Sequence, residues 1–250
     1  MNKGSSQGEM ASKYNQWVED NTKRGGAIVT QGGMHFKVHA DVFAPNITEL
    51  LMEMTPSFYP ENGRLLEIGS GCGLLAIHAV KCGGVKSAMA TDIVAACKAN
   101  IEENARDHGV ADKVEAVISD VFSDVSDENK FDAIFWNYPF IPDHSGREYD
   151  ELGDIERGIR DPGQQHLKTY CSQARKHLKP GGKLYVSYSQ TMGDWPAFSA
   201  IMKETEWNPT LFADFSAKGP QVQLWCLEDQ LPALLGAQDG AKTTPGHSIG

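Results

Sequence analysis

Long apolar runs and paired cysteines are both missing from this sequence of 250 residues. No apolar stretch approaches the ~20 residues of a membrane-spanning helix, and the first residues show no charged-then-apolar leader, so we expect neither a membrane partner nor secretion. The five cysteines include no Cys-x-x-Cys pair and no Cys/His cluster at zinc spacing, so we expect no metal. Their odd number disfavours a disulfide framework and fits a cytoplasmic, reducing environment.

Positive charge is also scarce in this chain. Lysine and arginine number 23 against 33 aspartates and glutamates, which gives a formal net charge of -10. A broad nucleic-acid surface needs clustered basic residues, so nucleic acid is the less favoured partner. A neutral or cationic substrate, either a small molecule or a protein, suits this balance better. The hydrophobic fraction of 40% is typical of a globular domain.

Glycine is concentrated in the stretch that we expect to organise the chain. An apolar run predicts a buried strand that ends before Gly69, Gly71 and Gly73, and apolar spacing from Leu74 predicts a helix. Strand, glycine turn and helix open a nucleotide-binding unit, because glycine lets the backbone approach a ligand and adopts positive φ. The stretch lacks the Gly-Lys-Ser/Thr of a phosphate-binding loop, and Leu74 stands where a dinucleotide fingerprint needs glycine. A tight turn without a ligand is the alternative interpretation.

Strands and helices alternate five times along the chain and end in a hairpin. This order predicts an α/β fold with a doubly wound, mostly parallel seven-stranded sheet and a C-terminal antiparallel hairpin. A turn at 179–183 is expected to lead into the fifth strand. The predicted strands are 64–68, 86–90, 114–118, 131–136, 184–189, 210–215 and 221–227.

Aspartates close two of these predicted strands. Asp92 ends the second strand, close to the roughly 20 residues after the glycine turn at which nucleotide-binding units carry an acid. A carboxylate there can accept hydrogen bonds from both hydroxyls of a ribose. Asp120 ends the third strand and is followed by Val121. Capping of the next helix is the alternative role for each aspartate.

Taken in order, these motifs resemble those of the Rossmann-like (class I) methyltransferases that use S-adenosyl-L-methionine (SAM). The resemblance covers residues 36–228 and includes Lys179-Pro180-Gly181-Gly182 before a strand. It implies SAM as the cofactor, with Asp92 at the ribose, Asp120 at the adenine amino group and Val121 on the adenine ring. The implied cofactor-binding residues are Glu67, Gly69, Ser70, Gly71, Gly73, Asp92, Ile93, Asp120, Val121 and Asn137.

The fourth predicted strand runs directly into Asn137-Tyr138-Pro139-Phe140. These four residues are similar to the Asn-Pro-Pro-Tyr/Phe motif of enzymes that methylate exocyclic amino or amide nitrogens of adenine, guanine and glutamine. An amide nitrogen is a poor nucleophile, so the Asn137 side-chain oxygen and the Tyr138 carbonyl would accept its N–H groups and orient it. Pro139 would rigidify the turn, and Phe140 would stack on a planar substrate. A turn with buried aromatic rings is the alternative.

Tyr138 departs from the motif, because it replaces the first proline. Other amino-methylating enzymes of this fold carry non-proline residues there, so the change keeps the catalytic interpretation. It weakens the resemblance to the glutamine methyltransferases in particular. No general base is assigned, because the attacked nitrogen can lose its proton after methyl transfer.

We expect three parts along the chain. Residues 1–35 hold a tail, a helix at about 10–23 and a hairpin over the pocket, residues 36–228 form the methyltransferase domain, and residues 229–250 form a flexible tail. The polar loop 141–161 is rich in acids and follows the catalytic turn. It either borders the substrate as an acidic rim or forms a solvated face.

The sequence thus predicts a SAM-dependent N-methyltransferase acting on an amino or amide nitrogen of a protein side chain or a small amine-bearing molecule. An RNA base methyltransferase is an alternative that a basic patch around the pocket would support. A non-catalytic SAM-binding partner subunit is another, disfavoured by the intact turn at 137–140. Leu74 and that turn also disfavour a NAD oxidoreductase.

Overall fold

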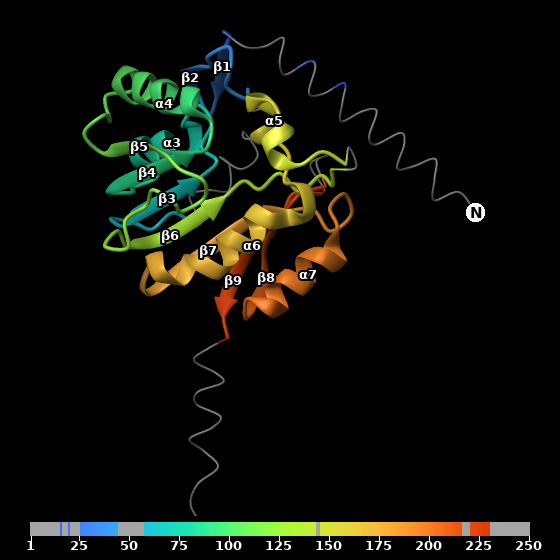
Figure 1. Cartoon of the computed structure of the whole chain (residues 1–250). Helices are drawn as coiled ribbons and strands as arrows, with labels where there is room; N and C mark the ends of the chain where they lie inside the picture. Colours follow the sequence, from blue (N-terminus) through green and yellow to red (C-terminus); the bar gives the residue numbers. More distant parts are fainter. Residues whose placement is uncertain are drawn as a thin grey trace, which may run out of the picture.

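Seven strands form one sheet in the computed structural model of the chain, which describes residues 16, 20, 26–44, 58–143, 146–216 and 221–230. The strands are β3 (Arg64–Ile68), β4 (Ser87–Asp92), β5 (Val114–Ile118), β6 (Phe131–Trp136), β7 (Leu178–Tyr188), β8 (Trp207–Asp214) and β9 (Gln223–Asp229). Their spatial order is β5-β4-β3-β6-β7-β9-β8 (Figure 1).

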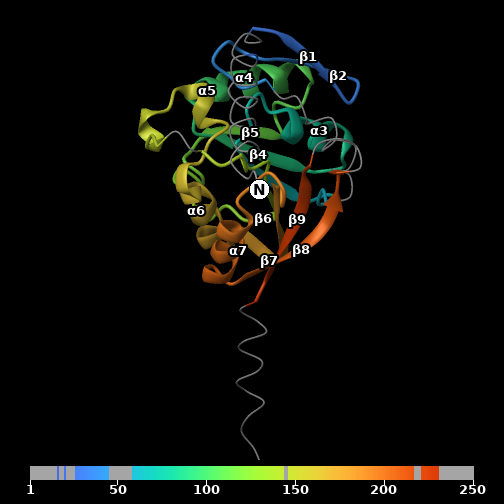
Figure 2. The ribbon, with the colours of Figure 1, turned by 90° about the vertical axis from the view of Figure 1, so that its right-hand side faces the viewer.

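The direction of the strands confirms the predicted fold class. Neighbouring strands from β5 to β7 are parallel, whereas β9 runs antiparallel to both β7 and β8. Figure 2 shows β8 and β9 side by side at one margin of the sheet. The last two strands therefore form the expected C-terminal hairpin, with β9 inserted between β7 and β8.

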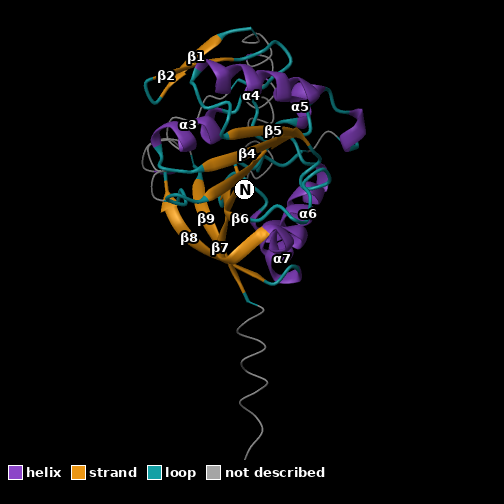
Figure 3. Cartoon of the chain, turned by 90° about the vertical axis from the view of Figure 1, so that its left-hand side faces the viewer, coloured by secondary structure: helices purple, strands orange, loops and turns teal. Residues whose placement is uncertain are grey.

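Helices cover both faces of the sheet, as Figure 3 shows. Because each parallel strand is buried on both faces, its sequence is nearly continuously apolar, as in Phe131–Trp136. One face carries α3 (Leu74–Cys82) and α4 (Ala95–Asp107), and the other carries α6 (Gln165–Gln173) and α7 (Trp195–Glu204). Shorter helical turns are η2 (Tyr149–Glu151), α5 (Asp154–Arg157), η3 (Pro162–Gln164) and η4 (Ala174–His177).

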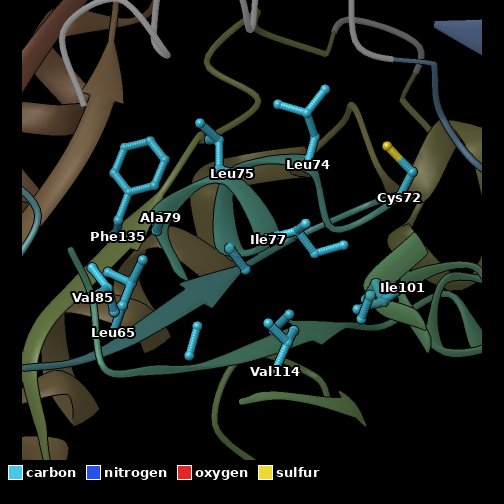
Figure 4. Close-up of a cluster of buried hydrophobic side chains, with 14 of the residues drawn as sticks. Leu65, Cys72, Leu74, Leu75, Ile77, Ala79, Val85, Ile101, Val114 and Phe135 are labelled. Carbon is cyan, nitrogen blue, oxygen red and sulfur yellow. The ribbon is translucent and has the colours of Figure 1, made fainter. Parts of the chain in front are cut away.

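Each helical layer encloses its own apolar cluster. Figure 4 shows the cluster beneath α3 and α4, in which Leu65 of β3, Ile77 of α3 and Ile101 of α4 are at most 1% exposed. The second cluster lies under α6 and α7 and includes Tyr170 and Tyr188, which are both fully buried. Burial on both faces makes the sheet a rigid base for the loops at its edge.

The turn predicted at 179–183 lies inside β7. Phe131 pairs with Leu178 and Ala133 pairs with Lys183, so the residues between them form an irregularity in the strand rather than a separate turn. Gly181 has a φ of 78°, which permits this local departure from extended geometry. The strand consequently begins earlier than the sequence predicted.

A hairpin of β1 (Ile28–Gln31) and β2 (Met34–Lys37) packs on α4 (Figures 1 and 2). Its position follows from hydrogen bonding, because the Asn100 and Asn104 side chains each donate to the Lys37 carbonyl at 2.9 Å. The predicted domain boundary between residues 35 and 36 therefore cuts through β2.

Two other predicted segments cannot be compared with the structure. The helix expected at about 10–23 lies outside the described residues apart from positions 16 and 20. The C-terminal tail beyond residue 230 also lies outside them.

Candidate functional site

The carboxyl ends of β3, β4, β5 and β6 meet at one edge of the sheet. Strand order reverses between β3 and β6, and in open parallel sheets ligands bind at such a switch point. A cleft lies there, with about 450 Å³ of space including the solvent at its mouth. Six of the predicted site residues line it: Gly69, Asp92, Ile93, Asp120, Val121 and Pro139.

The glycine turn joins β3 to α3 and leaves no room for side chains. Gly69 has a φ of 62°, and a methyl group on it would lie 2.8 Å from Trp136 Nε1. Gly73 has a φ of 81°, and a methyl group there would lie 3.0 Å from a side-chain atom of Ile101. The Ser70 N–H donates to the end of β4 at 2.9 Å. The backbone at Gly69 therefore borders the cleft directly.

Asp92 links the glycine turn to the end of β4. Its two carboxylate oxygens accept from the backbone N–H of Gly71 at 2.8 Å and from that of Val94 at 3.0 Å. Val94 is the N-cap residue of α4, and no side chain caps this helix, so Asp92 stabilises the turn before α4 rather than capping it. Burial raises the pKa of Asp92, although these hydrogen bonds oppose the shift. Each oxygen keeps a second lone pair for a ribose hydroxyl.

Glu67 lies behind the turn and does not line the cleft. Its carboxyl group accepts from the Ala76 N–H at 2.8 Å, and the residue is 3% exposed. Burial raises the pKa of Glu67 to about 8, against the opposing effect of that hydrogen bond, and the charge of Asp92 raises it further. Glu67 thus fixes the start of α3 to β3 and contacts no open space.

The turn after β5 presents Asp120 and Val121 to the cleft. The Asp120 side chain is 54% exposed. Val121 is buried and has a φ of 51°, a strained conformation for a β-branched residue. The Ser119 hydroxyl helps to hold it by donating to the Val121 carbonyl at 3.2 Å. Strain of this kind gathers at ligand sites, which agrees with a binding role for Val121.

Asn137 and Tyr138 follow β6 and are held by neighbouring elements. The Ser187 hydroxyl on β7 donates to Asn137 Oδ1 at 2.6 Å. The Tyr138 hydroxyl donates to Asp161 Oδ2 at 3.0 Å, and its ring stacks on Tyr188. Tyr138 is 2% exposed, so its ring lies in the core and only its backbone is available at the turn.

Pro139 lines the cleft, whereas Phe140 does not. Phe140 is 9% exposed, and its ring centroid lies 6.0 Å from that of Tyr188. The ring of Phe140 packs in the core in this structure, and its stacking on a substrate stays a prediction. This part of the motif matches the alternative of buried aromatic rings.

A wall of the cleft comes from the region after the motif, which the sequence reasoning did not assign residue by residue. Arg160 forms a buried ion pair with Asp143, with 2.6 Å between Nη1 and Oδ1. Glu148, Asp150 and Glu151 of the same region are exposed, which fits both the predicted acidic rim and the alternative of a solvated face. In the sequence, the only feature that pointed to these residues is that their segment directly follows residue 140. The additional lining residues are Tyr149, Arg157, Gly158, Arg160, Asp161 and His166.

The groups present fit SAM. Asp92 and Asp120 supply carboxylates at adjacent strand ends, Ile93 and Val121 are apolar residues that suit a purine, and the glycine turn borders the cleft at Gly69. In the described part of the chain, no group of His, Cys, Asp and Glu residues could hold a metal ion. None of the described helices has the length and apolarity of a membrane span.

Comparison with known proteins gives a consistent family. The model of the methyltransferase small domain matches residues 27–208. A protein of Methanocaldococcus jannaschii named a putative protein N5-glutamine methyltransferase is 27% identical over 67% of this chain and 82% of its own length. The release factor glutamine methyltransferase of Cereibacter sphaeroides is 30% identical over 64% of this chain. The matched region covers only 59% of the length of that relative.

Solved structures share the fold. The ribosomal protein L11 methylase of Lactobacillus delbrueckii subsp. bulgaricus aligns with a TM-score of 0.55 and 21% identity, covering 75% of this chain and 81% of that one. The family match extends over most of the chain and includes the glycine turn, both strand-end aspartates and Asn137. The chain therefore belongs to the methyltransferase small domain family, which confirms the prediction of a SAM-dependent methyltransferase.

Proposed function

We propose that the chain transfers a methyl group from SAM to the side-chain amide nitrogen of a glutamine in a protein. The observation that carries this proposal is the placement of Asn137 at the carboxyl end of β6, next to Pro139 of the cleft, with its side-chain oxygen held by Ser187. When bound, SAM supplies an electrophilic methyl group on a sulfonium.

The chain's own residues orient the acceptor nitrogen. Ser187 occupies one lone pair of Asn137 Oδ1 and leaves the other for an N–H of the acceptor. The Tyr138 carbonyl accepts the second N–H. Because both N–H groups of the amide nitrogen are hydrogen-bonded, the plane of the amide is fixed and its lone pair points in a defined direction. This arrangement raises the rate of methyl transfer by orientation rather than by acid–base chemistry.

Tyr138 supports this arrangement despite replacing a proline. Its hydroxyl is anchored to Asp161, whose side chain is 1% exposed, and its ring is stacked on Tyr188. These contacts fix the Tyr138 side chain and so limit the movement of its backbone, whereas a proline would fix φ through its ring. The motif thus keeps a defined carbonyl position by a different physical means.

A protein acceptor is favoured over RNA by the charges around the cleft. Glu148, Asp150, Glu151 and Asp154 are exposed on the loop that forms one wall. Their charges repel phosphates and attract basic peptide. The names of the two relatives, both glutamine methyltransferases, point in the same direction.

The test is methyl transfer from labelled SAM to a purified translation release factor, to a glutamine-containing peptide and to an RNA hairpin. We expect label on protein, located on a glutamine by mass spectrometry. Asn137→Ala should lower kcat about 100-fold, and Ser187→Ala should lower it less, because only the orientation of Asn137 is lost. Label on RNA alone, or equal activity of Asn137→Ala, would overturn the proposal.

A further inference from the structure

His166 lies between the cofactor side and the acceptor side of the cleft. It is the second residue of α6, lines the cleft and has a side chain that is 17% exposed. Its Nδ1 lies 2.8 Å from Asp161 Oδ1, and its Nε2 lies 3.5 Å from Asp120 Oδ1. One imidazole ring therefore spans two carboxylates that belong to different parts of the site.

This geometry favours a charged imidazole. Nδ1 of His166 donates to Asp161, and Nε2 faces the Asp120 carboxylate at ion-pair distance, an attraction that is strongest when the ring carries both protons. Burial by itself would lower the pKa of His166, but the hydrogen bond to Asp161 and the charges of Asp161, Asp120 and Asp150 outweigh it and raise the pKa. The Tyr149 ring packs on the imidazole, with 4.1 Å between centroids.

The two carboxylates differ in how firmly they are held. The Asp161 side chain is 1% exposed and also accepts from the Tyr138 hydroxyl and from the backbone N–H groups of His166 and Leu167. The Asp120 side chain is 54% exposed. His166 thus connects a fixed carboxylate beneath the acceptor turn to a solvated one at the mouth of the cleft.

We propose that His166 is a positioning residue that holds the Asp120 carboxylate toward the adenine end of the SAM site and links it, through Asp161, to Tyr138 of the acceptor turn. The proposal rests on the SAM site described above. His166 itself touches neither the methyl group nor the acceptor. It acts by limiting the rotation of Asp120, so that less freedom is lost when adenine binds.

Cofactor affinity should then depend on the protonation of His166. The groups that face it are Asp161, Asp120, Asp150 and Tyr149, and Arg157 and Arg160 line the same cleft. Loss of the imidazolium proton would release Asp120 first, because its contact is longer and more exposed. Affinity for the adenosine part should fall as the pH rises through the raised pKa of His166.

The experiment measures the dissociation constant of S-adenosylhomocysteine by calorimetry over a pH series that starts at about pH 6 and extends upward until the affinity no longer changes. The chief variant is His166→Asn, whose amide can keep the contact with Asp161 but cannot reach Asp120. Lys168→Ala, an exposed position on the same helix, is the matched control. Asp120→Asn and its combination with His166→Asn complete a double-mutant cycle.

We expect His166→Asn to weaken binding about tenfold at the lowest pH and to flatten the pH dependence. In the Asp120→Asn background it should have no further effect. His166→Gln, which can reach Asp120, should restore part of the affinity. Thermal unfolding of each variant separates lost folding from lost binding.

Three results would overturn the proposal. Unchanged affinity of His166→Asn, or equal weakening with and without Asp120, would show that His166 does not act through Asp120. Absence of binding by the unaltered chain would instead remove the SAM site itself, and with it the proposed function. These cases can be distinguished because Lys168→Ala and the unaltered chain are titrated in parallel with the other variants.

Discussion

At the scale of single residues, the environment sets the charge of the groups behind the cleft. Glu67 is buried, and its pKa of about 8 means that it carries a proton in the folded chain at neutral pH. Its ordinary pKa is 4.5, so the unfolded chain has lost that proton. Between these two values the folded state binds more protons than the unfolded state, and its stability falls as the pH rises.

Glu67→Gln should remove this dependence. Glutamine keeps an oxygen to accept from Ala76 and has no charge to bury. Between about pH 5 and 8 the unaltered chain should lose up to about 1.4 kcal/mol of unfolding free energy per pH unit relative to the variant. Chemical denaturation of both proteins across this range measures the difference. His78, His166 and His177 titrate in both proteins and so contribute to both in the same way. If the unfolding free energy of the two proteins changed with pH in parallel, the pH dependence could not be assigned to Glu67.

At the scale of elements, asparagines on α4 join the hairpin to the glycine turn. Asn104 is 1% exposed, and its side-chain N–H groups donate to the carbonyls of Lys37 and Cys72, both at 2.9 Å. Its oxygen accepts from the Lys37 N–H at 2.9 Å. One amide therefore satisfies backbone groups on two separate segments, which makes α4 a common support for both.

Asn104→Ala should destabilise the chain by about 2–4 kcal/mol, because it leaves buried backbone groups without partners. Glu103→Ala is the matched control on the same helix. Its ion pairs with Lys37 and His39 are solvent-exposed and screened, so its loss should cost clearly less than the loss of Asn104. Urea unfolding of both variants gives the comparison. Equal losses would show that the exposed charges, not the buried amide, hold the hairpin.

At the scale of the whole molecule, the site exists only because parallel strands end together. Gly69, Asp92, Asp120 and Pro139 follow four strands that are distant in sequence. Burial of the sheet on both faces fixes these ends relative to one another. A ligand held across several ends should therefore stabilise the entire fold rather than one loop.

SAM at about 100 times its dissociation constant should add about 2.7 kcal/mol to the unfolding free energy. For a chain of this size that corresponds to a rise in Tm of about 5–10 °C. Asp92→Ala should abolish most of the rise, because its carboxylate orders the glycine turn through Gly71 as well as facing the cleft. Thermal scans with and without SAM test this, and an equal shift in the variant would remove Asp92 from the site.

Much of this arrangement was predictable from the sequence. Local apolar runs and glycines predicted the strands, the turn before Leu74 and the order of elements, because these depend on neighbours in the chain. The acids at strand ends could be placed at one edge, since parallel strands end on the same side. The family resemblance could be detected for the same reason, because the motifs that carry it lie at the ends of these strands.

Tertiary structure alone decided which way the side chains of the irregular segments point. The sequence predicted neither the packing of Phe140 on Tyr188 nor the hydrogen bonds by which the asparagines of α4 hold the hairpin. No periodicity governs residues 141–166, so the contact of His166 with both Asp120 and Asp161 could not be predicted. Local pattern determined the frame, and contacts between residues distant in sequence determined which groups face the cleft.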